Sequence, residues 1–299
     1  HVTGVQTCAL PICRGDPERI GRFGIGFKSV YAYTRHPEVH SGDEHFCIEH
    51  YVRPLKAAPR TPGDGFTTLI ALPFDGLAVA PALAKQEITL AFERLDPMTL
   101  LFLRHVKRVE VTADGVVAVV LEKRRTDQMS PWVRLVELGS STNGAAQEKW
   151  LLFERAVKLL TPTGRDVESR VELAFELTPA SSMDAFEIVT RERAVLAVYF
   201  TTEWKTATGF ILQAPYVPTP ARDNIRQNDP TNSLLARESA ALVVDSLCWL
   251  RERGALRPGA LNTLPLKRSD FPEDTLLRPL FDRVLEAILG QPLLPAHTS

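Results

Sequence analysis

Alternating apolar and polar positions dominate the middle of the chain and predict strands. Residues 106–112 and 116–123 flank Asp114-Gly115, a dipeptide typical of a two-residue hairpin turn. Short runs rich in β-branched and aromatic residues predict further strands at 132–138, 150–159, 171–177, 195–201 and 209–214. The middle of the chain is therefore expected to be a strand-rich unit.

Apolar residues at helical spacing lie on both sides of this unit. Ile88, Phe92 and Leu95 share one helical face, and Asp96-Pro97 is a typical start for a short second helix. Two longer helices are predicted near the end, at 234–253 and 276–289, after a loop at 215–230 rich in Pro, Asn and Asp.

The N-terminal third mixes the two patterns. Residues 39–52 predict a hairpin around Gly42-Asp43, and residues 66–73 predict a buried strand because they are apolar and β-branched. The fold class expected from this order is α+β. Its expected parts are an α/β unit at 14–105, a strand-rich unit at 106–230 and a helical segment at 231–299.

The first residues do not fit this scheme. Residues 2–12 read VTGVQTCALPI, which an in-frame read through a widely used sequencing adaptor would encode. A signal peptide is the alternative, but no basic region precedes the apolar stretch, and Thr7, Cys8 and Pro11 interrupt it. Residues 1–13 are therefore treated as an artefact, and we expect the native N-terminal part to be missing.

Composition and charge exclude several classes of protein. The 299 residues are 44% hydrophobic and 24% charged, which is ordinary for a globular chain of about two domains. Lys+Arg 35 against Asp+Glu 36 gives a net charge of −1, which argues against nucleic acid as a partner. The apolar runs are too short to cross a bilayer, and four cysteines do not make a disulfide framework. We expect a cytoplasmic protein without a membrane partner.

The most informative local feature is Gly21-x-x-Gly24-x-Gly26, which leads into a helical pattern. Glycines let the backbone approach an anion closely, and a helix N-terminus adds a favourable dipole, so phosphate binding is one interpretation. A dinucleotide-binding motif would need a preceding strand, and a P-loop would need Gly-Lys-Ser/Thr, neither of which is present. A purely structural glycine turn is the alternative.

The longer string Ile-Gly-Arg-Phe-Gly-Ile-Gly-Phe-Lys-Ser at 20–29 resembles the lid motif of the GHKL ATPases. The closest branch is that of the ninety-kilodalton heat-shock chaperones and sacsin-like proteins. In this family the loop closes over the phosphates of ATP. The resemblance implies that ATP is bound by Gly21, Arg22, Phe23, Gly24, Ile25, Gly26 and Phe27.

Two further segments resemble the same family. Thr68-Leu69-Ile70-Ala71-Leu72 is similar to the Gly-Thr-x-x-x-Leu strand beside the adenine, although Thr67 stands in place of the glycine. The resemblance gives Thr68 a place in the nucleotide pocket, whereas an ordinary β-branched strand needs no ligand.

Residues 214–225 resemble the middle-domain loop whose arginine reaches the γ-phosphate, which implies a catalytic role for Arg222. A guanidinium from a second domain stabilises the charge that develops during phosphoryl transfer. The alternatives for Arg222 are an exposed loop arginine or a salt bridge with Asp223.

Two motifs that the family needs are missing. No Asn follows a Glu by four residues, and no Asp-x-Gly-x-Gly occurs. In the family these motifs provide the catalytic Glu, the Mg²⁺ ligand and the adenine anchor, and both precede the lid, so truncation explains their absence.

The resemblance therefore implies a truncated GHKL α/β sandwich, a transducer-like middle domain and a helical C-terminal segment. ATP and Mg²⁺ would be the cofactors of the full-length protein, and client proteins its further partners. ATP hydrolysis would drive conformational change or protein remodelling, while this fragment would be inactive. A non-enzymatic scaffold and a nucleic-acid-linked ATPase are the alternatives.

Four histidines invite a metal interpretation. His36, His40, His45 and His50 lie near Cys47 and Glu49, but their spacing fits no standard zinc motif. Strand alternation places His45, Cys47 and Glu49 on one face of the hairpin. We expect a solvated hairpin face here and assign no metal ligands.

Overall fold

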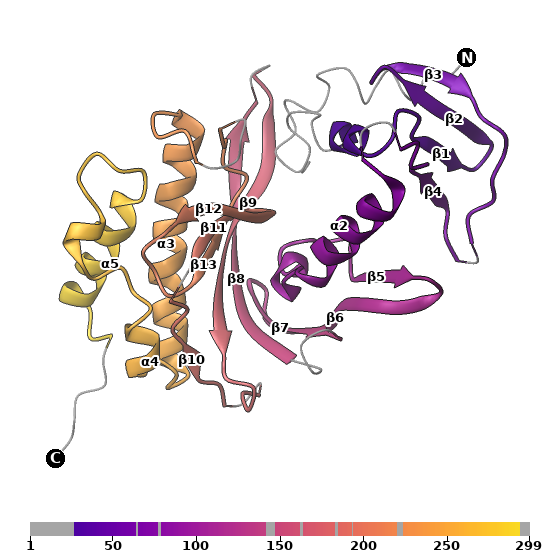
Figure 1. Cartoon of the computed structure of the whole chain (residues 1–299). Helices are drawn as coiled ribbons and strands as arrows, with labels where there is room; N and C mark the ends of the chain where they lie inside the picture. The colour runs from indigo at the N-terminus through magenta and orange to yellow at the C-terminus, as the bar shows by residue number, and fades with distance from the viewer. Residues whose placement is uncertain are drawn as a thin grey trace. The chain divides into compact units, whose positions relative to one another are not determined.

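The computed structural model describes residues 27–63, 65–76, 79–141, 147–161, 164–182, 185–192, 194–219 and 224–293. Helices and strands are both present, so the α+β class is confirmed (Figure 1). The chain forms two compact units, His1–Arg94 and Leu95–Ser299. The helices at the C-terminal end therefore share a unit with the strand-rich region.

The first unit contains a four-stranded sheet in the order β3-β2-β1-β4. Its strands are β1 (Glu38–Ser41), β2 (Glu44–Glu49), β3 (Arg53–Lys56) and β4 (Thr68–Ala71). Two helical elements belong to it as well, the 3-10 helix η2 (Phe27–Ala32) and α2 (Pro81–Glu93). The predicted hairpin is confirmed, because Gly42 adopts a positive φ of 56° between β1 and β2.

Few residues are buried in this unit. The strand predicted at 66–73 is confirmed over Thr68–Ala71 as β4, but the prediction that it is buried is wrong, because Phe66 and Ile70 are 74% and 52% exposed. Strand propensity reports a fit to a pleated surface, and it does not show whether another layer covers that surface.

The second unit is built on a nine-stranded sheet in the order β12-β11-β13-β9-β8-β7-β6-β5, with β10 beside β9. All of its pairings are antiparallel except that of β11 with β13. The bounds are β5 Arg108–Ala113, β6 Val116–Ser130, β7 Val133–Ser140, β8 Gln147–Leu160, β9 Asp166–Leu177, β10 Ile188–Val189, β11 Val195–Val198, β12 Phe200–Lys205 and β13 Ile211–Gln213. The Asp114-Gly115 hairpin is confirmed, with positive φ at both residues.

Helices cover one face of this sheet (Figure 1). They are α3 (Pro230–Glu252), α4 (Pro258–Leu261) and α5 (Arg278–Gly290), and a short 3-10 helix, η4 (Arg268–Asp270), lies between α4 and α5. Leu151 and Phe153 of β8 belong to the core between sheet and helices. Trp150 and Leu152 alternate with them and pack in a second core with η3 (Pro97–Leu100). The central strands are therefore covered on both faces. None of the described helices has the length and apolar character needed to cross a membrane.

Candidate functional site

The glycine motif lies largely outside the described residues. Gly21, Arg22, Phe23, Gly24, Ile25 and Gly26 fall outside them, and Phe27 is the first residue inside. Phe27 begins η2, and its side chain is 37% exposed. Further along η2, the Tyr31 hydroxyl donates a hydrogen bond to the carbonyl oxygen of Ile48 at 3.0 Å. This contact anchors the helical turn after the glycines to β2.

Thr68 is the first residue of β4, and its side chain is exposed. It pairs with Ser41 of β1, and the two hydroxyl oxygens lie 2.9 Å apart. Among the strands of the described residues, β4 lies at the edge of this sheet, and Thr68 is exposed there. The predicted binding residues Phe27 and Thr68 therefore belong to the same unit.

Arg222 lies outside the described residues, but the residues on both sides of it are described. Pro218 and Ile225 form an isolated bridge, and the amide of Thr219 donates to the carbonyl of Asn224 at 2.8 Å. The described residues on either side of Arg222 therefore form a narrow two-stranded stem. Thr68 belongs to the first unit, so the two parts of the predicted site come from different units.

Asn232, in the first turn of α3, fastens this stem. Its side chain is completely buried, its Oδ1 accepts from the amide of Val217 at 2.7 Å, and its Nδ2 donates to the carbonyls of Val217 and Arg226 at 3.1 and 2.9 Å. Asn232 is not among the site residues predicted from the sequence. Its position just after Asp229-Pro230, an N-cap followed by proline, is the local signal that could have located it.

Replacing Asn232 by alanine should therefore loosen the stem. Three hydrogen bonds disappear and buried backbone groups lose their partners, so we expect Asn232→Ala to lower the free energy of unfolding by about 2 kcal/mol. Chemical denaturation measures this loss, and amide exchange at Val217 should become faster. Asn228→Ala, at an exposed position of the same loop, is the control. Equal stability of the two variants would contradict the role of Asn232 in holding the stem together.

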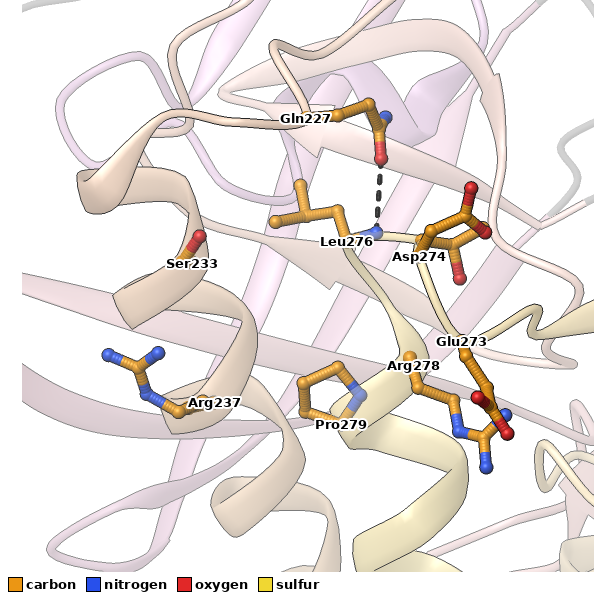
Figure 2. A pocket seen from close by; sticks show the side chains of 9 residues that line it. Gln227, Ser233, Arg237, Glu273, Asp274, Leu276, Arg278 and Pro279 are labelled. Atoms are coloured by element: carbon orange, nitrogen blue, oxygen red, sulfur yellow. Dashed lines mark hydrogen bonds between the residues drawn. The ribbon is translucent and has the colours of Figure 1, made fainter.

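A cavity of about 280 Å³ lies beside the end of this loop (Figure 2). Its walls come from the start of α3 and from the segment leading into α5, and Gln227 closes one end by accepting from the amide of Leu276 at 3.0 Å. Its lining residues are Gln227, Ser233, Arg237, Glu273, Asp274, Thr275, Leu276, Arg278 and Pro279. The volume lies below the range of about 300–1,000 Å³ that is usual for ligand pockets, so we do not assign the nucleotide to it.

Charged side chains gather on the sheet face opposite the helices. Glu172 of β9 is almost completely buried, and its Oε1 lies 3.3 Å from Nη2 of Arg134. Arg134 and Arg170 both contact Glu154, at 2.7 and 3.0 Å. Burial raises the pKa of Glu172 to about 7, although the neighbouring arginines oppose this shift.

Lys123 of β6 joins this charged face to the segment after η3. Its Nζ donates to the carbonyls of Leu101 and Leu103 at 3.2 and 2.9 Å, and burial lowers its pKa to about 8. Lys123 also interacts electrostatically with Glu172 and Arg134, so the two groups with shifted pKa values influence each other. Glu172 has a sequence signal, because it is a charged residue between the apolar Val171 and Leu173 of one strand, whereas Lys123 lies between the charged Glu122 and Arg124 and has none.

The histidine face is less solvated than expected. His40 is completely buried, and its ring nitrogens face His45 and Glu38. The predicted alternation itself holds: Cys47 is paired with Glu38, and His45 with His40. Cys47 and Cys248 are free thiols in the part of the chain that the structure describes.

Comparison with known proteins gives one distant relative. Protein NO VEIN of Arabidopsis thaliana is 25% identical over 261 residues, which are 78% of this chain and 9% of that protein. The chain therefore spans a small part of the length of the relative that it matches. No protein-family model matches the chain. No solved structure matches it at a significant level.

Proposed function

We propose that the chain is part of an ATP-binding and ATP-hydrolysing protein of the GHKL superfamily, in its sacsin-like or heat-shock-chaperone-like branch. The observation that carries the proposal is the glycine string at 20–29, followed along the chain by the Thr68 strand and the Arg222 loop. In this proposal the glycine segment closes over the phosphates and Thr68 lines the nucleotide pocket. Hydrolysis drives conformational change or remodelling of a client protein.

The described residues are compatible with this assignment. The Thr68 hydroxyl is exposed and has a neutral partner, Ser41, so it can also bond to a ligand. Asn232 holds the described residues on both sides of Arg222 together through Val217 and Arg226, which supports the proposal of a positioned guanidinium. Such an arginine would speed hydrolysis by stabilising the charge that develops on the transferred phosphoryl group.

In this proposal, Mg²⁺ needs ligands from outside the described residues. Among the described residues, no group of three or more His, Cys, Asp or Glu side chains is placed to hold a metal ion. The sequence also contains no Glu-x-x-x-Asn. In this proposal Mg²⁺ is held by a preceding segment of the full-length protein together with the phosphate oxygens of ATP.

Turnover by the full-length protein tests the proposal. We expect Mg²⁺-dependent ATP hydrolysis, which Arg222→Ala should lower by about 1,000-fold, as is typical for an arginine that stabilises phosphoryl transfer. Arg226→Ala, an exposed arginine of the same loop, is the matched control and should hydrolyse ATP at the wild-type rate. Residues 14–299 alone should show negligible hydrolysis.

The alternative is a non-enzymatic scaffold on a degenerate GHKL fold, which would not hydrolyse ATP in this assay. It is favoured by the missing Glu-x-x-x-Asn and Asp-x-Gly-x-Gly motifs. If the native gene also lacks both motifs and its product neither binds nor hydrolyses Mg²⁺-ATP, the ATPase proposal is wrong. Turnover by residues 14–299 would contradict the assignment of catalysis to a preceding segment.

A further inference from the structure

Two histidine rings face each other across the β1–β2 hairpin. His40 and His45 are directly paired in the antiparallel register, and their Nδ1 atoms lie 3.1 Å apart. The ring centroids are 5.3 Å apart and the ring planes are tilted by 42°. Two nitrogens at this separation can share one hydrogen. They can also bind one metal ion, because two nitrogens with bonds of about 2.0 Å lie about 2.8 Å apart in square-planar and about 3.3 Å apart in tetrahedral coordination, and the observed 3.1 Å lies between these values.

The second ring nitrogen of His40 has an acidic partner. Its Nε2 lies 3.3 Å from Oε2 of Glu38, and Nε of Arg60 lies 3.4 Å from the same oxygen. A carboxylate paired with an arginine accepts hydrogen bonds, so Nε2 of His40 carries the hydrogen and Nδ1 keeps its lone pair. Metal-binding histidines usually have this arrangement, in which a carboxylate fixes the ring and makes it a better ligand.

We propose that His40 and His45 form a binding site for a late divalent transition metal ion, with Cu²⁺ bound most tightly. The two Nδ1 atoms supply the protein ligands and water completes the coordination. His45 is only half-buried, so the site is open to water on its side. When the metal binds, the hydrogen on Nδ1 of His45 moves to its Nε2, and the neutral pair loses no proton.

The ligand chemistry selects the metal. Imidazole nitrogen suits copper, nickel and zinc, whereas Mg²⁺ and Ca²⁺ prefer oxygen ligands. Among divalent first-row metals, affinity for nitrogen sites is highest for Cu²⁺. The two nitrogens come from paired positions of adjacent strands, so the ladder holds them in place before the ion arrives. This site does not depend on the proposed ATPase function.

Copper titration of the whole chain tests the proposal, with the bound Cu²⁺ observed by electron paramagnetic resonance. The wild-type spectrum of the tightest site should show coupling to two imidazole nitrogens. His45→Ala should remove one of them and weaken binding at least about tenfold, because even changes behind a ligand typically cost 10- to 100-fold. His105→Ala, an exposed histidine of the second unit, should leave this site unchanged.

A second variant covers the case in which His45→Ala fails to fold. Glu38→Gln keeps both rings and removes the charge behind His40, so Cu²⁺ affinity should fall about tenfold. Circular dichroism reports whether each variant is folded. If folded His45→Ala, or folded Glu38→Gln where only that variant folds, binds Cu²⁺ with the wild-type spectrum and affinity, the metal site is refuted.

Discussion

Phe153→Ala should lower the free energy of unfolding of the second unit by about 3–5 kcal/mol, the usual cost of removing a large aromatic side chain from a core. Phe153 is completely buried on the sheet face that the helices cover. Its ring packs edge-to-face against Phe175 of β9 and Trp249 of α3, with centroids 6.0 and 5.3 Å away. No small adjustment can fill the cavity, because both neighbours belong to rigid elements.

Thermal and chemical denaturation measure this effect. The melting temperature should fall by on the order of 10 °C for a unit of this size. Leu160→Ala, on the same strand but with its side chain 68% exposed, is the matched control and should change stability by less than about 0.5 kcal/mol. Similar losses in the two variants would show that α3 does not pack on β8 as described.

Stability should also fall as the pH rises from 5 to 7.5, because of Glu172. Burial raises the pKa of this carboxyl from 4.5 to about 7 in the folded chain. Between these values the folded chain binds more protons than the unfolded chain, so the free energy of unfolding decreases with increasing pH. The charged groups around Glu172 are Arg104, Lys123, Arg134, Glu154 and Arg170.

Glu172→Gln removes this dependence because the amide does not titrate. Between pH 5 and 7.5, the wild-type chain should lose about 2 kcal/mol more stability than the variant. Glu168→Gln, at an exposed position of the same strand, should keep the wild-type slope. Parallel stability curves for wild type and Glu172→Gln would show that the carboxyl is already ionised at pH 5. Measurements end at pH 7.5, because Lys123, whose pKa burial lowers to about 8, is half-titrated at pH 8.

Most elements of the second unit could be predicted, since the patterns that specify them are local. The single strand predicted at 195–201 is wrong: the structure has two antiparallel strands there, β11 and β12, and Tyr199 between them adopts a positive φ of 64°. Asp114-Gly115 determines its hairpin turn through the positive φ that both residues adopt. The apolar spacing predicted at 234–253 and 276–289 corresponds to α3 and α5. Burial in the first unit could not be predicted, because the sequence of β4 is the same whether or not another layer covers Ile70.

Some candidate site residues could be recognised from the sequence, and others could not. Motif residues such as Thr68 and Arg222 are recognisable from short strings, and their roles remain proposals. Other candidate residues are defined by contacts between different strands or elements. These residues are Asn232, Glu172, and the facing pair His40 and His45. No string within the sequence marks these contacts, because the partners lie on different strands or elements.

The sequence by itself determined the α+β class, the hairpins and the C-terminal helices, because turn chemistry and periodicity act over a few residues. Tertiary structure alone decided which strands are covered and which charged groups are buried. It also decided that His40 faces His45 and that Asn232 holds both ends of a loop. These outcomes depend on which surfaces meet, and burial then sets the cost of every polar group that has no partner.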